Sequence, residues 1–307
     1  MGEQPQHLRI ATRGSELALA QAAAVGEALR QCHPELSTEL VVMTTRGDRE
    51  KGPLADVGGK GLFTAELEAA LRGGRAHLAV HSAKDLPAAM DEDLVIVAVP
   101  PREDARDALV SPGGCAAAEL PAGARVGTSS LRRSAQVLAM RPDLTIVPLR
   151  GNVPTRVRKV LDLRQLDAAV LAMAGLIRLG AHNAHRANIH PLTLQECTPA
   201  AGQGALALQC LAASEAAEIV RAIDDAPSRA ALEAERAVLR ALGAQCNSCL
   251  GVHVAPGQGR WMAMGMAARA DGSGMIRLRE EAPSAAAAGD ALLKALLSNG
   301  AQELLAS

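Results

Sequence analysis

The chain is poor in aromatic residues: its 307 residues include no Tyr, one Phe and one Trp. Hydrophobic cores must therefore be packed from Ala, Leu, Val and Ile. Binding of single-stranded nucleic acid is disfavoured, because proteins of that class stack bases on aromatic side chains. The net charge of −1 also gives no general attraction to nucleic acid or to a membrane surface. We therefore expect neither as a partner.

Long apolar segments and a cysteine framework are lacking as well. No run of about 18 apolar residues occurs, and no apolar run follows a basic start, so we expect no membrane span and no signal peptide. The six cysteines do not have the spacing of a disulfide scaffold. Reduced thiols are usual in the cytoplasm, which is where we expect this protein.

Lysine is scarce, with 5 Lys against 27 Arg. The planar guanidinium of Arg binds carboxylates through two parallel hydrogen bonds, which Lys cannot do. The base composition of the gene is an alternative explanation for the ratio, but it does not explain the clustering of Arg. Residues 121–160 hold eight basic residues and one acidic residue, Asp143. This stretch suits a cleft that binds a small polyanion.

The length favours two or three domains, and strand-like runs alternate with helical patterns. This alternation indicates a largely parallel sheet with helices on both faces. In the first hundred residues we predict strands at 8–11, 39–43, 78–80 and 95–99, and helices at 64–72 and, capped by Ser15, at 15–31. In a second α/β region we predict strands at 125–127, 145–149 and 168–172, and helices at 131–140, 154–163 and around 177. In the C-terminal region we predict strands at 251–255, 261–269 and 275–279, and helices at 284–297 and, capped by Ser228, at 228–242.

Three segments fall outside these patterns. Residues 100–104 begin with two prolines and are predicted as a hinge. Residues 199–204 are predicted as a second crossing between domains. Residues 46–61 are polar and contain five glycines, so we predict a flap over a cleft.

Four short polar strings, three of which contain glycine, precede a cysteine that directly follows a charged helix. The strings are VGGKGLF (57–63), HSAKDLP (81–87), GTSSLRR (127–133) and LRGNV (149–153), and the cysteine is Cys246. This combination, in this order, resembles the hydroxymethylbilane synthase family, also called porphobilinogen deaminase. The resemblance runs from Leu8 to about Glu303. In that family a cysteine of the last domain anchors a pyrrole cofactor, and the upstream strings build the cleft around it.

The resemblance implies a fold of three domains. We expect two type II periplasmic-binding-protein-like α/β domains around a cleft, followed by a smaller C-terminal α+β domain that anchors the cofactor. In this family the chain returns to the first domain at the second crossing. The expected domains are therefore residues 1–101 with 202–220, residues 102–201, and residues 221–307.

The resemblance also implies a reaction. The family condenses four porphobilinogen molecules head to tail into hydroxymethylbilane, with ammonia released at each step, in the biosynthesis of porphyrins and haem. By resemblance this chain is a transferase with a dipyrromethane cofactor attached through Cys246, and it requires no metal and no nucleotide. We expect a cytoplasmic monomer whose partner is its small-molecule substrate.

Asp85 is the predicted catalytic residue. It follows the strand predicted at 78–80, and the carboxyl edge of a parallel strand is where α/β proteins place ligands. A carboxylate there can bind a pyrrole N–H and stabilise the positive charge that develops as an amine leaves. Position alone leaves open an ion pair with Lys84 or a cap of the next turn. The resemblance implies the acid/base role, with contact to the cofactor.

The other predicted site residues bind carboxylates or pyrrole rings. The GTSSLRR string ends a strand and opens a helix, so its N–H groups and hydroxyls form an anion site. By resemblance, the cofactor is bound by Lys84, Ser129, Arg132 and Arg133. By resemblance, the substrate carboxylates are bound by Arg13, Ser15, Thr128, Arg150, Arg156 and Arg178. A solvated surface position stays open for each Arg.

Two residues at the end of the predicted flap complete the expected substrate site. Lys60 adds positive charge there. Phe63, the one Phe of the chain, packs either in a core or against the flat pyrrole rings.

The loop of Cys246 departs from the family pattern of two glycines before the cysteine and a proline three residues after it. Ala244, Gln245 and Cys249 stand at those positions. The Cys246–Cys249 spacing also occurs in redox and zinc sites, but the sequence context of either is missing. We predict no metal site, because no ligand spacing is present among His182, His185 and His190.

A rival class is a non-catalytic protein. Two lobes around a hinge also make solute receptors, and an altered cysteine loop is compatible with an inactive paralogue. A secreted receptor requires a signal peptide, and we find none in this sequence. The rival is therefore a two-lobed binding protein for a small polyanion, or an inactive paralogue.

Overall fold

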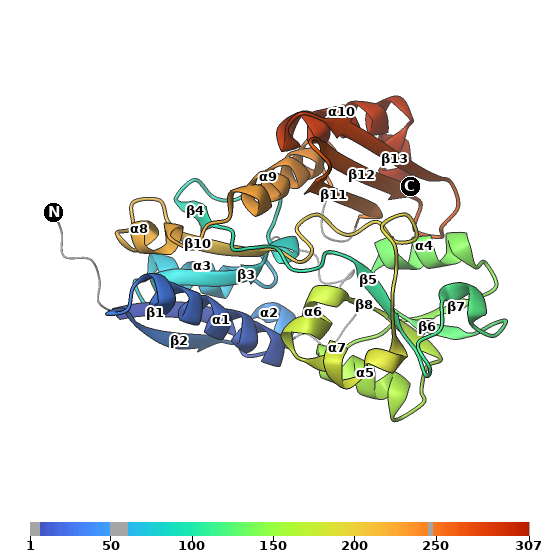
Figure 1. Ribbon diagram of the computed structural model, residues 1–307, viewed down its shortest axis with the longest axis horizontal. Coiled ribbons are helices and arrows are strands. Elements are labelled where there is room, and N and C mark those ends of the chain that lie inside the picture. The colour runs from blue at the N-terminus through green and yellow to red at the C-terminus, as the bar shows by residue number, and fades with distance from the viewer. Residues whose placement is uncertain (1–6, 50–60, 245–247, 307) are drawn as a thin grey trace. The chain divides into compact units, whose positions relative to one another are not determined.

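The computed structural model describes residues 7–49, 61–244 and 248–306 (Figure 1). The chain divides into two compact units. Unit 1 comprises Met1–Arg102 and Ala205–Arg229, and unit 2 comprises Glu103–Gly204 and Ala230–Ser307. The chain passes from unit 1 to unit 2 after Arg102, within the predicted hinge at 100–104. It returns to unit 1 after Gly204, at the end of the predicted crossing at 199–204.

Unit 1 is built on a five-stranded sheet with the order β2-β1-β3-β10-β4. Its strands are β1 (His7–Arg13), β2 (Ser37–Met43), β3 (Leu78–Ser82), β4 (Leu94–Ala98) and β10 (Leu206–Leu211). Strand β1 runs parallel to both β2 and β3, whereas β10 runs antiparallel to both of its neighbours. Four of the five strands therefore run in one direction, and the exception is β10, which comes last in the sequence.

The helices of unit 1 are α1 (Glu16–Cys32), α2 (Arg46–Arg49), α3 (Ala65–Arg72), α8 (Ala216–Arg221) and the 3₁₀ turn η1 (Ala83–Asp85). Of these, α1 and α3 lie within one residue of their predicted ranges, whereas α2, α8 and η1 were not predicted. Ser15 caps α1, and its hydroxyl accepts a hydrogen bond from the Ala18 N–H at 3.3 Å. The core packs Leu8 and Ile10 of the sheet against Leu29 of α1.

Unit 2 contains a second five-stranded sheet, with the order β7-β6-β8-β5-β9. Its strands are β5 (Asp107–Val110), β6 (Arg125–Gly127), β7 (Thr145–Val147), β8 (Ala168–Ala172) and β9 (Ile189–Pro191). Strand β6 runs parallel to β7 and β8, and β5 runs antiparallel to its neighbours. The order repeats that of unit 1: in each sheet the antiparallel strand is the one that follows a crossing segment.

Short helices accompany the second sheet. They are α4 (Leu131–Met140), α5 (Val153–Leu161), α6 (Met173–Arg178), α7 (Ala181–Ala184) and the 3₁₀ turns η2 (Ala117–Glu119) and η3 (Arg186–Asn188). Ser130 caps α4, and Asn152 caps α5 with Pro154 in its first turn. Both helices therefore begin directly after a segment that the sequence marked as polar.

The C-terminal region is a three-stranded antiparallel sheet covered by helices. Its elements are β11 (Leu250–Pro256), β12 (Trp261–Ala268), β13 (Met275–Ala282), α9 (Ala226–Ala241), α10 (Ala285–Ser298) and α11 (Ala301–Ala306). The core consists of Ala, Leu and Val, as the lack of aromatics requires. Gly265 of β12 lies against Leu292 of α10, where an added Cβ would meet the Leu292 side chain at 2.8 Å.

One helix start was predicted wrongly. Helix α9 begins at Ala226, two residues before the predicted start, and its first turn includes Pro227. Its cap is Asp225, whose carboxylate accepts a hydrogen bond from the Ser228 N–H at 2.9 Å. The Ser228 hydroxyl instead accepts a hydrogen bond from the Arg102 N–H at 2.9 Å.

The predicted fold class is confirmed: two α/β sheets of the type II periplasmic-binding-protein order and a smaller C-terminal α+β region. The exact three-domain boundaries stay a prediction, because the C-terminal region groups with the second sheet in unit 2. None of the helices in the described ranges is long and apolar enough to cross a membrane.

Candidate active site

In unit 1, the predicted site residues lie at one edge of the sheet. Strands β1 and β3 are parallel and end at Arg13 and Ser82, so the segments after them leave the sheet at the same carboxyl edge. Arg13 and Ser15 lie on the first of these segments, and Lys84 and Asp85 lie on η1, the second. This is the edge where open α/β sheets bind ligands.

The Asp85 carboxylate is half-buried at this edge. Among the residues that the structure describes, no hydrogen bond or ion pair engages it. The two structural alternatives from the sequence, a pair with Lys84 and a cap of the next turn, are therefore not found in the described part of the chain. Such a carboxylate is available to a ligand.

His81 of β3 is buried and contacts the neighbouring strand β10. Its Nε2 lies 2.9 Å from Gln209 Oε1. Burial lowers the pKa of His81 to about 4, with Arg13 adding to the effect and the Gln209 hydrogen bond opposing it. His81 is therefore a neutral, structural imidazole at neutral pH.

Arg13 is held by a carboxylate of the same unit. It forms an ion pair with Asp48, and its guanidinium lies over the Phe63 ring, 4.2 Å from the ring centroid. Burial favours the neutral form of Asp48, but hydrogen bonds from Arg13 and Thr45 outweigh it and keep the pKa of Asp48 below its ordinary value. Phe63 is thus half-buried beneath Arg13, and Lys60 lies outside the described residues.

In unit 2, the GTSSLRR string joins β6 to α4, as predicted. The Thr128 hydroxyl accepts a hydrogen bond from the Ser130 N–H at 3.2 Å. The Ser129 hydroxyl donates to the Leu149 carbonyl and accepts from the Leu149 N–H, both at 3.0 Å. Ser129 therefore ties the loop after β6 to the loop after β7, immediately before Arg150.

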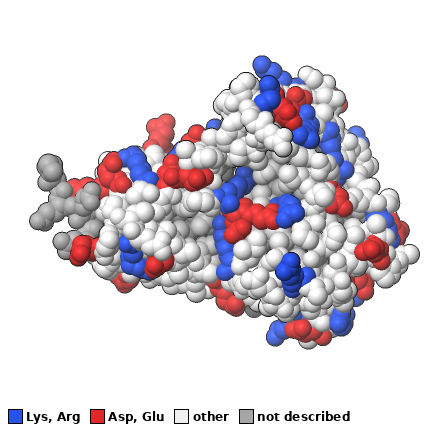
Figure 2. All heavy atoms as spheres, viewed as in Figure 1, with Lys and Arg blue, Asp and Glu red and all other residues white. Residues whose placement is uncertain are grey.

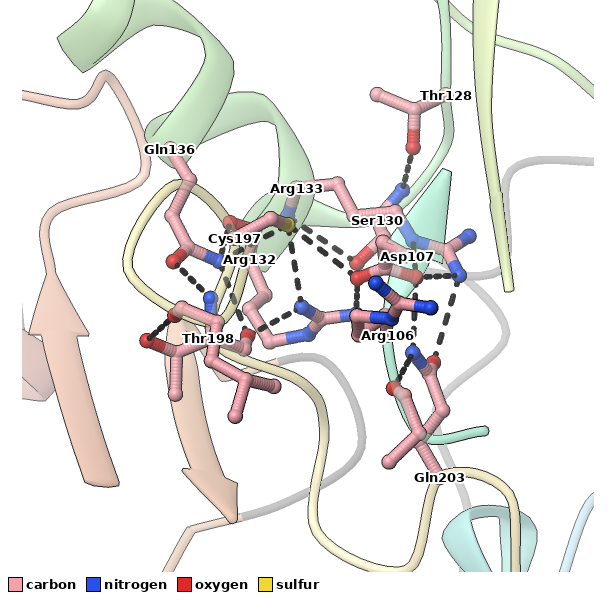
Figure 3. A network of polar contacts seen from close by, with 12 residues as sticks. Arg106, Asp107, Thr128, Ser130, Arg132, Arg133, Gln136, Cys197, Thr198 and Gln203 are labelled. Carbon is pink, nitrogen blue, oxygen red and sulfur yellow. Dashed lines mark hydrogen bonds and ion pairs between the residues drawn. The ribbon is translucent and has the colours of Figure 1, made fainter. Parts of the chain in front are cut away.

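Arg132 and Arg133 are buried and share one carboxylate, that of Asp107 (Figure 3). Arg132 Nη2 lies 2.9 Å from Asp107 Oδ2, and Arg133 Nη2 lies 2.6 Å from Asp107 Oδ1. Arg132 Nη1 also donates to the Thr198 carbonyl at 2.5 Å. The count of basic residues in 121–160 missed this partner, because Asp107 lies outside that window.

The remaining predicted arginines of unit 2 are half-buried. Arg156 Nε donates to the Gly151 carbonyl at 2.7 Å, and Lys159 Nζ donates to the Arg150 carbonyl at 3.2 Å. Arg178 Nη2 donates to the Gly204 carbonyl at 2.7 Å. Burial lowers the pKa of Arg178, and the charge of Glu103 opposes this shift.

Cys246 and the preceding Gln245 lie outside the described residues, whereas Cys249 is described and buried. Burial raises the pKa of the Cys249 thiol to about 11, so it is protonated at neutral pH. In residues 7–49, 61–244 and 248–306, no group of three or more His, Cys, Asp or Glu is placed to bind a metal ion.

The predicted residues therefore form two sets, one in each unit. Unit 1 holds Arg13, Ser15, Phe63, Lys84 and Asp85, and unit 2 holds Thr128, Ser129, Arg132, Arg133, Arg150, Arg156 and Arg178. Basic and acidic side chains are mixed on the face shown in Figure 2 rather than separated by sign.

Sequence comparison finds a matching family model and relatives that match nearly the whole chain. The family model described as "Porphobilinogen deaminase, dipyromethane cofactor binding domain" matches residues 8–219. The chain is 46% identical over 304 residues to porphobilinogen deaminase of Syntrophotalea carbinolica, covering 98% of this chain and 95% of the relative. It is 47% identical over 301 residues to that of Desulforudis audaxviator, covering 97% and 96%.

Solved structures show more distant likenesses. The methionine-binding protein MetQ is 16% identical, with a TM-score of 0.41 over 71% of this chain and 88% of its own. The aliphatic sulphonate binding protein SsuA from Escherichia coli is 17% identical, with a TM-score of 0.39 over 79% and 76%. Because these TM-scores lie below 0.5, neither adds to the assignment.

Proposed function

Because this chain belongs to the porphobilinogen deaminase family, it is a transferase that condenses porphobilinogen into hydroxymethylbilane, and we propose which of its residues carry the reaction. The relatives match over nearly the whole chain, so the rival readings as a solute receptor or an inactive paralogue are not favoured. The observation that carries the proposal is the Asp85 carboxylate at the carboxyl edge of the sheet in unit 1, unengaged within the described residues.

The matched family model names a dipyrromethane-binding domain. A dipyrromethane made from two porphobilinogen units would carry their carboxylate side chains. The buried Arg132 and Arg133 fit such a group, because their two guanidiniums share the single carboxylate of Asp107 and one positive charge remains in excess. Lys84 and Ser129 complete the proposed set, and the Cys246 thiolate forms the thioether. When bound, the cofactor supplies the pyrrole end to which the first substrate is joined.

Asp85 is the proposed acid/base group. As the amine of porphobilinogen leaves, the pyrrole nitrogen gains positive charge, and a nearby carboxylate stabilises that charge. The electrophilic azafulvene formed in this way is attacked by a free pyrrole α-carbon. Loss of the α-proton then restores the aromatic ring, and we assign the acceptance of that proton to Asp85.

The arginines hold the carboxylates of the substrate and of the growing chain. We assign this role to Arg13, Arg150, Arg156 and Arg178, with Ser15, Lys60 and Thr128 as further donors, and we assign to Phe63 packing against the pyrrole rings. Arg13 is now paired with Asp48, so a substrate carboxylate would replace Asp48 or share the guanidinium with it. Each such contact positions a pyrrole ring without taking part in bond formation.

The test is the stoichiometry and the rate of the reaction. Purified protein incubated with porphobilinogen should release one linear tetrapyrrole for four molecules of ammonia. The Asp85→Asn protein should release both far more slowly, at an unchanged melting temperature. Binding of porphobilinogen without release of ammonia by the unmodified protein would exclude the proposed function.

A further inference from the structure

The contacts of Arg132 and Arg133 point to a third residue, Asp107 at the start of β5 (Figure 3). Asp107 is completely buried, and each of its oxygens faces a different arginine. Oδ2 lies 2.9 Å from Arg132 Nη2, and Oδ1 accepts from Arg133 Nη2 at 2.6 Å and from Arg133 Nε at 3.1 Å. One carboxylate therefore fixes the direction of both guanidinium planes.

Neutral donors in turn fix the carboxylate. Gln203 Nε2 donates to Asp107 Oδ1 at 2.9 Å and to the Ala105 carbonyl at 2.8 Å. The Cys197 thiol donates to Oδ2 at 3.3 Å. Burial raises the pKa of Cys197 to about 12, so this thiol stays protonated and remains a donor. Asp107 thus accepts hydrogen bonds from two neutral side chains, Gln203 and Cys197, in addition to its ion pairs with the two arginines.

The charges of this trio do not cancel. Two guanidiniums and one carboxylate leave a net charge of +1, and all three side chains are at least nine-tenths buried. An excess charge in a buried site is unfavourable unless a counter-charge binds there. Within the described residues of unit 2, Arg133 Nη1 makes no hydrogen bond. The trio therefore has the charge and a donor for one more carboxylate.

We propose that Asp107 is a positioning residue that holds Arg132 and Arg133 in the geometry needed to take up a carboxylate of the dipyrromethane. Asp107 itself makes no contact with that group and does no chemistry. The proposal rests on the proposed function, because it requires the two arginines to bind the cofactor. It adds a residue that none of the four polar strings contains.

The test compares cofactor content with stability in purified full-length variants. Asp107→Asn keeps the size of the side chain and removes the charge. Asp107→Glu keeps the charge and moves it by one methylene. Intact mass gives the fraction of each protein that carries the dipyrromethane, and thermal melting gives its stability. If Asp107 aligns a charged contact that the cofactor needs for its uptake, the fraction of Asp107→Asn protein that carries the dipyrromethane should fall about tenfold or more.

Two controls separate positioning from general destabilisation. Leu109→Ala, on the same strand and buried, should lower the melting temperature and keep the cofactor. Asp104→Asn removes a carboxylate that lies three residues before Asp107 in the sequence and pairs with Arg106, and this variant should also keep the cofactor. Should Asp107→Asn fail to fold, Asp107→Glu decides, with an expected loaded fraction clearly below that of both controls.

The outcomes are distinct. Full loading of a folded Asp107→Asn or of Asp107→Glu would overturn the positioning role, as would equal loss of cofactor in Leu109→Ala at the same melting temperature. If the unmodified protein itself carries no dipyrromethane, the proposed function fails instead. Normal loading of the unmodified protein and both controls, with loss in the Asp107 variants, supports the proposal.

Discussion

The Arg132 guanidinium lies 2.9 Å from the Asp107 carboxylate in the interior of unit 2, so this arginine is part of the fold as well as of the predicted site. Arg150 is different, since it is half-buried and follows the loop that Ser129 holds. The two residues, which the sequence grouped together, are therefore expected to respond differently to substitution.

Arg132→Leu should lower both stability and cofactor content. Removing Arg132 takes a charged donor away from Asp107 Oδ2 and from the Thr198 carbonyl, while Arg133 still pairs with Asp107, so we expect a cost of about 1.5–3 kcal/mol in the free energy of unfolding. Urea unfolding measures this cost, and intact mass measures the cofactor. A Arg132→Leu protein of normal stability would mean that the pair with Asp107 contributes little.

Arg150→Leu should weaken substrate binding with little effect on folding. Loss of one charge-assisted contact to a carboxylate should cost about 1.5–3 kcal/mol, seen as a higher KM for porphobilinogen. The matched control is Arg260→Leu, since Arg260 is exposed and donates to the Glu281 carbonyl in the C-terminal sheet. Equal kinetics for the two variants would contradict a carboxylate-binding role of Arg150.

The parts of the site that the sequence predicted are those with local causes. Ser15 caps α1 because a hydroxyl precedes a helical run, and the GTSSLRR string connects β6 to α4 for the same reason. Asp107 could not be predicted in this way, because its partners lie 25 and 26 residues further along the chain. Strand β10 likewise pairs with β3 only through the tertiary fold, and its antiparallel direction leaves no local signal.

Competing local signals explain the wrong cap of α9. Asp225 and Ser228 are both good caps, three residues apart on either side of Pro227. Proline is compatible with the first turn of a helix as well as with the segment before it. The hydrogen bond from Arg102 engages the Ser228 hydroxyl, and this contact across the sequence favours the earlier start.

His81 should make the protein sensitive to acid. Its folded-state pKa is about 4, below the ordinary 6.5, so below pH 6.5 the unfolded chain binds more protons than the folded protein. Stability contributed by the neutral imidazole is present above pH 6.5 and is lost as the pH falls toward 4, in total about 3 kcal/mol. Urea unfolding at pH 7 and pH 5 should show a smaller decrease for His81→Gln than for the unmodified protein. An identical decrease in both would show that His81 does not titrate in this way.

Asp85→Asn should separate binding from chemistry. The amide keeps the size of the side chain but loses the charge that stabilises the developing cation. Turnover should fall by about 10²-fold or more. Melting temperature should not change, because no contact within the described residues holds this carboxylate. Near-normal turnover of a folded Asp85→Asn protein would assign this chemistry to another group.

The intact mass of the purified, unmodified protein, followed by peptide mapping, tests the central claim most directly. We predict an excess equal to two linked pyrrole units, located on the peptide that contains Cys246. It should be absent from Cys246→Ser and retained in Cys249→Ser, whose thiol is buried and protonated in the unmodified protein. An unmodified mass, or pyrroles attached to Cys249 or any other residue, would contradict the account.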